Sequence, residues 1–283
     1  MSSQSGQFAG RGVLVTGGAS GIGLAIAGEF LARGARVLVA DRDREGLARL
    51  PDRLGGDDRL LTVEVDLAEP ETPGRLGAQA EDLLGGVDAL VNNAGLMRQT
   101  PALEITVAEW DELFAVNLRA VFFLTQSVAR AMAERGGGAV VSVASVNALR
   151  TEAPEAHYNA TKAGIVSVMR SFATELGHRG VRFNCVAPGE TVGAAEASGY
   201  TDADRDRTRR YLQRVPLRRV GLPEEMARVV CFLASDEASY VSGQTIVADG
   251  GELAGDWYDT ESRPPVPERM AGIDPDADIS EPR

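Results

Sequence analysis

Short apolar segments alternate with helix-like segments from residue 12 to about residue 250. The apolar segments are rich in Val, Ile and Leu, and seven are predicted as strands: 13–16, 36–40, 60–65, 87–91, 139–143, 181–186 and 244–248. Helical periodicity is found in 22–33, 73–84, 108–135, 158–176 and 223–234. Continuously apolar strands are typical of parallel sheets covered on both faces. The sequence therefore predicts a doubly wound α/β fold, with a seven-stranded, mainly parallel sheet and helices on both faces.

The charge balance excludes one class of partner. The 283 residues include 29 Lys and Arg against 41 Asp and Glu, which gives a net charge of −12. Nucleic acid is not an expected partner, because its phosphates are bound by clustered positive charge. The chain has no apolar stretch of about 18 residues and no signal-like start, so we expect no membrane partner and a cytoplasmic location.

Few residues in the sequence suit a metal site or a disulfide. The two cysteines, Cys185 and Cys231, each lie in an apolar run and are predicted to be small buried hydrophobic residues. His157 and His178 are the two histidines, and we expect surface or supporting roles for them. No His, Cys, Asp and Glu grouping has the spacing of metal ligands, so no metal is predicted.

The chain is expected to form one domain with extensions at both ends. Residues 1–11 precede a single domain, 12–251, in which a segment at about 190–214 interrupts the alternation. Its charged part, 201–210, is predicted as a surface helix that either is simply solvated or serves as a substrate lid. Residues 252–283 are acidic and proline-rich and read as an extended tail, in which Trp257 and Tyr258 are expected to dock.

A glycine-rich loop, Thr16–Gly23, follows the first predicted strand and opens the first helix. Such a loop brings backbone N–H groups and a helix N-terminus to a pyrophosphate. Asp41 ends the next strand, where a carboxylate accepts hydrogen bonds from the adenosine ribose and repels a 2′-phosphate, so NAD is favoured over NADP. Arg42 leaves NADP open, since a guanidinium can neutralise that phosphate. The predicted contacts in the loop are Gly17, Ser20, Gly21, Ile22 and Gly23.

Three motifs in order resemble the short-chain dehydrogenase/reductase family: the Thr16–Gly23 loop, Asn92-Asn93-Ala94-Gly95, and Tyr158-x-x-x-Lys162. The resemblance covers residues 12–251 and implies a Rossmann fold that binds a nicotinamide dinucleotide. It places further cofactor contacts at Asp66, Leu67, Asn93, Ala94, Gly95, Pro188 and Gly189, with Asn92 beside the cofactor. Thr191 is expected to replace a threonine that the family usually has where this chain has Gly193. The resemblance also implies a homotetramer or homodimer that packs through the helices 108–135 and 158–176.

Tyr158 and Lys162 lie four residues apart, so a helix places them on one face. A nearby ammonium lowers the pKa of a tyrosine and makes proton exchange with an alcohol feasible, so Tyr158 is the predicted acid and base. Ser145 follows the fifth strand and is predicted to orient the substrate oxygen, whereas Ser142 is a strand side chain. Asn117 lies in an otherwise apolar row, and the family resemblance implies that it binds a water that links Lys162 to solvent.

The predicted function is hydride transfer between the nicotinamide of NAD and a secondary alcohol or ketone. Two alternatives stay open: an NADPH-dependent reductase of β-ketoacyl or polyketide-like substrates, and a non-catalytic NAD-binding sensor or scaffold. The candidate substrate contacts are Arg98, Asn147, Arg150 and Glu190. The two arginines indicate a polar or anionic substrate, or else they face solvent or pair with acids.

Overall fold

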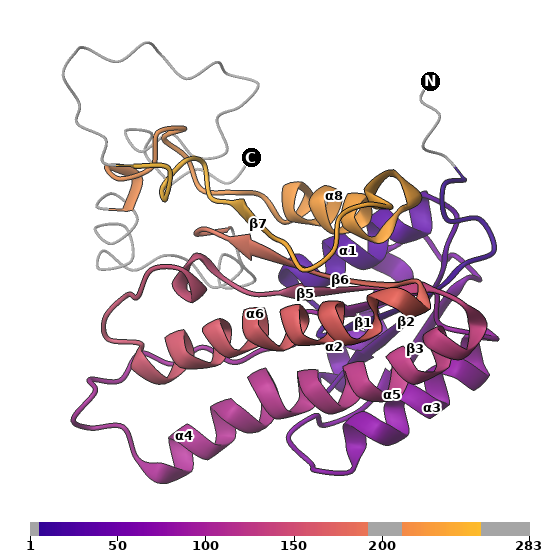
Figure 1. The fold of residues 1–283 in the computed structure, drawn as a ribbon, viewed down its shortest axis with the longest axis horizontal. Helices are drawn as coiled ribbons and strands as arrows, with labels where there is room; N and C mark the ends of the chain where they lie inside the picture. Colours follow the sequence, from indigo (N-terminus) through magenta and orange to yellow (C-terminus); the bar gives the residue numbers. More distant parts are fainter. Residues whose placement is uncertain (1–5, 192–210, 256–283) are drawn as a thin grey trace.

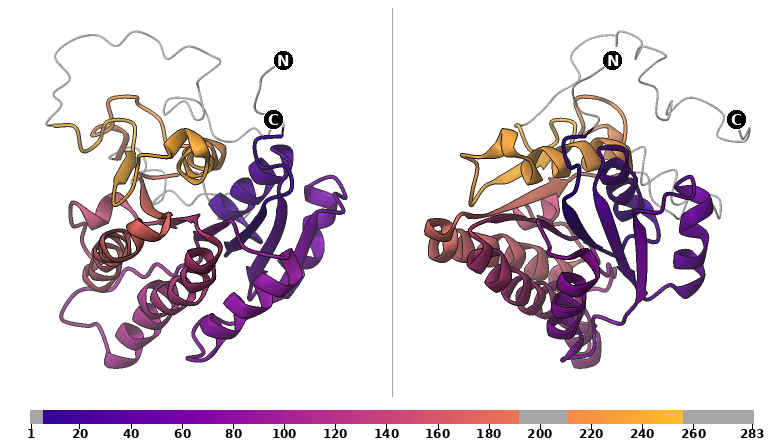
Figure 2. Two further views of the ribbon diagram at one scale, coloured as in Figure 1. Left: turned by 45° about the vertical axis from the view of Figure 1, so that its right-hand side comes forward. Right: turned by 90° about the vertical axis from the view of Figure 1, so that its right-hand side faces the viewer.

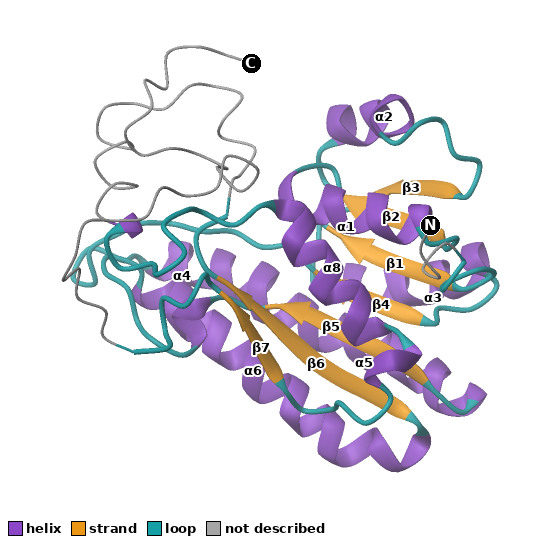
Figure 3. Cartoon of the chain, turned by 90° about the horizontal axis from the view of Figure 1, so that it is seen from above, coloured by secondary structure: helices purple, strands orange, loops and turns teal. Residues whose placement is uncertain are grey.

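The computed structural model describes residues 6–191 and 211–255. Its seven strands form one parallel sheet in the order β3-β2-β1-β4-β5-β6-β7, and Figure 3 looks onto the face of this sheet. The strands are β1 (Gly12–Thr16), β2 (Arg36–Asp41), β3 (Leu60–Glu64), β4 (Ala89–Asn92), β5 (Gly138–Val143), β6 (Val181–Pro188) and β7 (Thr245–Ala248). All seven predicted strands are confirmed, and the sheet is wholly parallel within the described residues.

Helices cover both faces of the sheet (Figures 1 and 2). The helices are α1 (Gly21–Ala32), α2 (Arg44–Arg53), α3 (Thr72–Leu84), α4 (Val107–Phe114), α5 (Ala120–Arg135), α6 (Ala156–Leu176) and α8 (Pro223–Ala234). α1 and α8 pack together on one face, whereas α3, α5 and α6 lie on the other. The predicted layer order is therefore confirmed.

The alternation of side chains along each strand divides the core in two. On β1, Val13 and Val15 point toward α1 and α8, while Leu14 points toward the α3 and α5 side. All three side chains are fully buried. This two-sided burial explains why the central strands read as continuous apolar runs, whereas the edge strands β3 and β7 are partly exposed.

The long helix expected over 108–135 contains an irregular turn. A π-helical segment, Ala115–Arg119, joins α4 to α5, so the helical run is continuous but wider at this point. Isolated π turns are frequent at functional sites because they move one side chain out of the regular register. The residue moved here is Asn117, at the middle of the segment.

α2 has no counterpart in the sequence analysis. It is short, and Pro51 lies inside it, which makes the segment a poor helix by propensity. The helix starts where the carboxylate of Asp43 accepts a hydrogen bond from the N–H of Gly46 at 2.9 Å. The burial of Leu47 and Leu50 against the sheet then holds it in place.

The interrupting segment and the tail are partly outside the described residues. The predicted surface helix 201–210, Gly193, Trp257 and Tyr258 all lie there. The described end of the interruption forms a small apolar cluster of Tyr211, Leu212, Val215 and Val220. Glu252, the first residue of the predicted tail, is buried at 4% exposure, so it belongs to the domain.

Candidate active site

The loop between β1 and α1 has a shape that requires glycine. Gly17 adopts a φ of +65°, and a Cβ at this position would lie 2.7 Å from the Cα of Ala94. The N–H of Ala19 donates a hydrogen bond to Oδ2 of Asp41 at 3.0 Å. The carboxylate predicted to select the cofactor therefore lies directly beside the glycine loop.

The N-terminus of α1 fits a pyrophosphate. Ser20 precedes the helix and makes no side-chain capping hydrogen bond among the described residues. A Cβ on Gly21, whose φ is +53°, would meet only open space, whereas one on Gly23 would lie 2.1 Å from the carbonyl oxygen of Gly17. Backbone N–H groups of the first turn thus remain available to an anion that approaches closely.

Asn93 joins the end of β4 to this loop. Its side-chain amide donates to the backbone carbonyls of Thr16 at 3.0 Å and Gly17 at 2.8 Å. The amide of Asn92 points the other way, is buried, and donates to side chains on α5 and β5. Asn92 therefore holds β4 within the core, and Asn93 holds the glycine loop.

Ser145, Tyr158 and Lys162 meet at the carboxyl end of the sheet. Ser145 follows β5 and forms a side-chain hydrogen bond with Tyr158. Lys162 lies one turn further along α6, with its Nζ 5.5 Å from the centre of the Tyr158 ring. The same Nζ donates to the carbonyl of Val143 at 2.9 Å. Ser142, as predicted, is instead a fully buried strand side chain.

Burial controls the protonation of this pair in the protein alone. It raises the pKa of Tyr158 to about 12, and the hydrogen bond from Ser145 lowers it only in part. Burial also lowers the pKa of Lys162 to about 8. The pKa of Tyr158 in the protein by itself is therefore raised, against the expectation that it is lowered, because desolvation is the largest contribution.

Asn117 is placed at the back of the site by the π-helical segment. Its Oδ1 accepts from the N–H of Leu96 at 2.7 Å, and its Nδ2 donates to the carbonyl of Leu96 at 2.8 Å and to Thr161 at 3.2 Å. A Cβ on Gly95 would lie 3.5 Å from the Asn117 oxygen and 3.6 Å from Nζ of Lys162. Asn117 and Lys162 therefore border the same small space beside Gly95.

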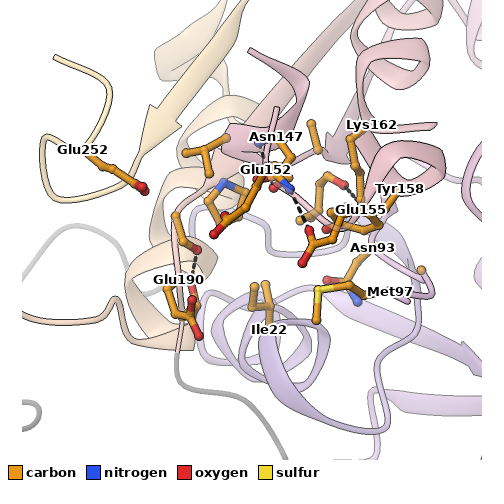
Figure 4. A pocket seen from close by; sticks show the side chains of 18 of the residues that line it. Ile22, Asn93, Met97, Asn147, Glu152, Glu155, Tyr158, Lys162, Glu190 and Glu252 are labelled. Carbon is orange, nitrogen blue, oxygen red and sulfur yellow. Dashed lines mark hydrogen bonds between the residues drawn. The ribbon is translucent and has the colours of Figure 1, made fainter. Parts of the chain in front are cut away.

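One cavity of about 320 Å³ joins these groups (Figure 4). Eleven of the residues predicted from the sequence line it: Ile22, Asn93, Gly95, Ser145, Asn147, Tyr158, Lys162, Pro188, Gly189, Glu190 and Thr191. Among its other lining residues, four with ionisable side chains were missed by the sequence analysis: Glu152, Glu155, Tyr211 and Glu252. Its size suits a small molecule.

The four missed residues had weak or misleading sequence patterns. Glu152 and Glu155 follow Ser145 within ten residues, so their proximity to a strand end could have marked them. Tyr211 and Glu252 are distant in sequence and reach the cavity through tertiary packing. The hydroxyl of Tyr211 accepts from the N–H of Glu190 at 2.9 Å, and Glu252 was assigned to the tail.

The two arginines predicted as substrate contacts pair with carboxylates. Arg98 forms an ion pair with Glu112 at 2.9 Å on the surface, and Arg150 forms one with Glu252. Neither arginine lines the main cavity. The indication of an anionic substrate therefore loses its basis, because these charges are already neutralised within the protein.

The remaining predicted contacts lie around the loop and below the cavity. Arg42 is exposed beside Asp41, and Asp66 is exposed after β3 with its carboxylate accepting from the N–H of Ala68 at 2.9 Å. Leu67 is buried in the core on the α3 side. The hydroxyl of Thr191 donates to the carbonyl of Gly189 at 3.1 Å.

Other chemically active residues take structural positions. Both cysteines are free and buried, as predicted. His178 is exposed, whereas His157 is fully buried rather than at the surface, and neither ring nitrogen has a hydrogen-bond partner among the described residues. The described part of the chain holds no group of three or more potential metal ligands. In those same ranges no helix is both long and apolar enough to cross a bilayer.

Comparison with known proteins gives relatives over most of the chain. The sequence profile of the family described as enoyl-(acyl carrier protein) reductase matches residues 17–252. The chain is 38% identical over 245 residues to the L-rhamnose 1-dehydrogenase (NAD(P)(+)) of Azotobacter vinelandii, covering 84% of this chain and 95% of that protein. It is 39% identical over 245 residues to the D-threitol dehydrogenase of Mycolicibacterium smegmatis, covering 86% and 92%.

A solved structure agrees with the sequence comparison. A protein titled "short chain dehydrogenase/reductase family protein" superposes with a TM-score of 0.79 at 37% identity, over 88% of this chain and 100% of that one. The sequence relatives named above are both dehydrogenases, and the name of one includes NAD(P)(+). The chain therefore belongs to the short-chain dehydrogenase/reductase family and is an oxidoreductase that uses a nicotinamide cofactor.

Proposed function

We propose that this enzyme oxidises a secondary alcohol, or reduces the matching ketone, with NAD as its preferred cofactor. The observation that carries the proposal is the meeting of Ser145, Tyr158 and Lys162 in one cavity below the glycine loop. When bound, the nicotinamide supplies or accepts the hydride. The protein supplies position, charge and a path for the proton.

Tyr158 is the proposed acid and base at the substrate oxygen. The hydroxyl of Ser145 donates to that oxygen and so stabilises the charge that develops there. The Lys162 ammonium, held by the carbonyl of Val143, stabilises the phenolate when Tyr158 gives up its proton. Asn117 keeps the neighbouring backbone in place beside Lys162 and supports the proposed route for the proton to solvent.

Replacing Tyr158 tests this assignment. Tyr158→Phe keeps the ring but removes the hydroxyl, so we expect kcat to fall at least about 100-fold, with NADH binding nearly unchanged. Tyr240→Phe is the matched control, because Tyr240 is fully exposed and far from the cavity. Substantial turnover by Tyr158→Phe would overturn the proposed mechanism.

The preference for NAD rests on Asp41. Its two carboxylate oxygens accept from the N–H groups of Ala19 and Asp43, both at 3.0 Å, which fixes a negative charge beside the loop. A 2′-phosphate at this position is repelled, whereas ribose hydroxyls find an acceptor. Arg42 is exposed beside Asp41, and its side chain is the group that would favour NADP instead.

Parallel thermal-shift titrations with NADH and NADPH test this preference, because a ligand of the native state raises its stability. We expect a larger shift with NADH. Asp41→Asn keeps an acceptor for Ala19 and is expected to reduce the selectivity about tenfold, whereas Arg42→Ala removes the guanidinium that would neutralise a 2′-phosphate and is expected to increase it. A larger shift with NADPH for the natural protein would instead favour a ketoacyl-type reductase.

We further propose that the enzyme is a homo-oligomer that pairs through α4, α5 and α6. Apolar side chains are exposed on the first two helices, with Trp110 at 41%, Phe122 at 36% and Phe123 at 43%. Phe122 also contacts Phe172 of α6, with ring centres 5.4 Å apart. Light scattering tests this, since Phe123→Asp is expected to shift the protein toward a smaller species.

A further inference from the structure

Glu155 is a buried carboxylate in the wall of the catalytic cavity. The residue is 4% exposed. Its Oε1 accepts from the amide of Gln99 at 2.9 Å, and its Oε2 accepts from the amide of Asn147 at 2.8 Å. Within residues 6–191 and 211–255, no Lys, Arg or His forms an ion pair with it. A buried charge without a cation is costly, so its presence beside a cavity calls for a reason.

A network of amide hydrogen bonds connects this carboxylate to Ser145 at the reaction centre. Asn147 also donates to Oδ1 of Asn159 at 2.9 Å, and its backbone N–H donates to Oγ of Ser145 at 3.1 Å. Glu155 lies three residues before Tyr158, and its charge contributes to the raised pKa of Tyr158. Figure 4 shows Asn147, Glu155 and Tyr158 together on one side of the cavity. The Glu155 carboxylate is thus linked through Asn147 to Ser145 of the catalytic group.

Four carboxylates line the cavity, and when Lys162, Arg150 and Arg214 are counted with them the negative charges exceed the positive ones by one. Glu190 and Glu252 lie on the side opposite Glu155 (Figure 4). Glu252 is neutralised by Arg150 and by Arg214, whose guanidinium lies 3.4 Å from it. Lys162 is buried at the reaction centre, so an ammonium group on a substrate would meet a positive charge as well as carboxylates. Arg150 and Arg214 are already paired with Glu252, so neither is free to bind an anionic substrate. A neutral molecule with several hydroxyl groups matches these surroundings best.

We propose that Glu155 determines specificity by accepting a hydrogen bond from a second hydroxyl of a neutral polyhydroxylated substrate. Each carboxylate oxygen carries two lone pairs, and the two amides use one on each. One acceptor position per oxygen therefore remains for the substrate. This inference rests on the proposed function, because it requires that the first hydroxyl react at Tyr158.

The test compares three compounds with the same four-carbon skeleton. These are 2,3-butanediol, 2-butanol and 3-amino-2-butanol, each assayed with NAD and the full-length natural enzyme. A hydrogen bond to a charged acceptor predicts a kcat/KM for the diol at least about tenfold above that for 2-butanol. Equal values, or a preference for the amino alcohol, would overturn the proposal without any variant being made.

A matched pair of variants assigns the preference to Glu155. Glu155→Gln is expected to reduce the diol-to-butanol ratio to about 1, mainly through a higher KM for the diol. Glu152→Gln is the control, because Glu152 lines the same cavity but is partly exposed and lies 3.6 Å from Arg214. An unchanged ratio in Glu155→Gln would contradict the assignment.

The two proposals fail in different ways. If Tyr158→Phe retains turnover of 2-butanol, the proposed mechanism is wrong, whatever the ratio. If Tyr158→Phe is inactive and the natural enzyme makes no distinction between the diol and 2-butanol, only the role of Glu155 is wrong.

Discussion

The two sides of the cavity are built by different means. On the glycine-loop side, backbone groups and short-range contacts make the surface, as in the hydrogen bond between Ala19 and Asp41. On the opposite side, ion pairs join residues from distant parts of the chain, such as Arg150 and Glu252. In the proposed function the first side binds the cofactor and the second binds the substrate. Short-range backbone geometry is therefore suited to cofactor binding, which members of a family share. Long-range pairing of side chains is suited to substrate binding, which varies among them.

The glycine-loop side should be the more sensitive to a single methyl group. Gly23→Ala places a Cβ 2.1 Å from a backbone oxygen and 2.4 Å from Nδ2 of Asn93. Relief of this clash must move the loop, so we expect NADH to bind about 30- to 100-fold more weakly, a loss of about 2–3 kcal/mol. Isothermal titration with NADH measures it.

Gly28→Ala is the matched control on the same helix. Its Cβ would meet only the far end of the Leu54 side chain, at 3.2 Å. Alanine also favours a helix interior over glycine by about 1 kcal/mol, so NADH binding should be unchanged and the protein no less stable. Equal affinity of both variants for NADH would show that the glycine loop accommodates a Cβ at Gly23 without loss of cofactor binding.

Lys162 tests where the two sides meet. Burial lowers its pKa to about 8 from 10.5, so above pH 8 the folded protein has released a proton that the unfolded chain still holds. Its contribution therefore raises the free energy of unfolding by about 2 kcal/mol between pH 8 and pH 10, and is smallest below pH 8. Urea denaturation of the ligand-free protein should show this rise relative to Lys162→Met.

Arg170→Met provides the comparison for that experiment. Arg170 lies on the same helix but is exposed, so its removal should leave the difference between pH 8 and pH 10 as it is in the natural protein. If Lys162→Met also keeps the full rise, burial of the ammonium does not control its titration.

The glycine-loop side of the cavity could be predicted from the sequence more fully than the opposite side. The glycine loop, Asp41 and the Tyr158–Lys162 pair were all accessible because each depends on a fixed spacing within one or two adjacent elements. Glu252 was not, because its burial depends on Arg150 and Arg214, which are 102 and 38 residues away along the chain. The pKa of Tyr158 was misjudged for a related reason, since spacing reveals a neighbouring charge but not the depth of burial.

The fold was predicted more completely than the site. Seven strands were found because β-branched runs are unmistakable when both faces are buried. The exceptions depend on single side chains. Pro51 inside α2 makes its sequence a poor helix by propensity. The π-helical segment has no sequence pattern of its own, and its Asn117 donates to the backbone carbonyl of Leu96. A side chain that chooses its partner in three dimensions leaves no periodic pattern.

The substrate side should show a moderate effect when its central carboxylate loses its charge. Glu252→Gln leaves two half-exposed guanidinium groups without their buried partner, so we expect a loss of about 1–2 kcal/mol in unfolding free energy. We also expect a higher KM for the substrate, because Glu252 lines the cavity and is held there by Arg150 and Arg214. Glu152→Gln, which loses one partly exposed contact at 3.6 Å, should change stability far less.

The smallest effect on stability and activity is expected at Arg98, which the sequence analysis took as a substrate contact and which forms a surface ion pair with Glu112. Arg98 and Glu112 are 46% and 40% exposed at the side chain, so water screens their attraction. Arg98→Ala should change the unfolding free energy by less than about 0.5 kcal/mol and leave kcat/KM unaltered. Glu112→Ala should do the same, and the double variant should match the sum of the two. A drop in kcat/KM confined to Arg98→Ala would return this arginine to the substrate side, and with it an anionic group on the substrate.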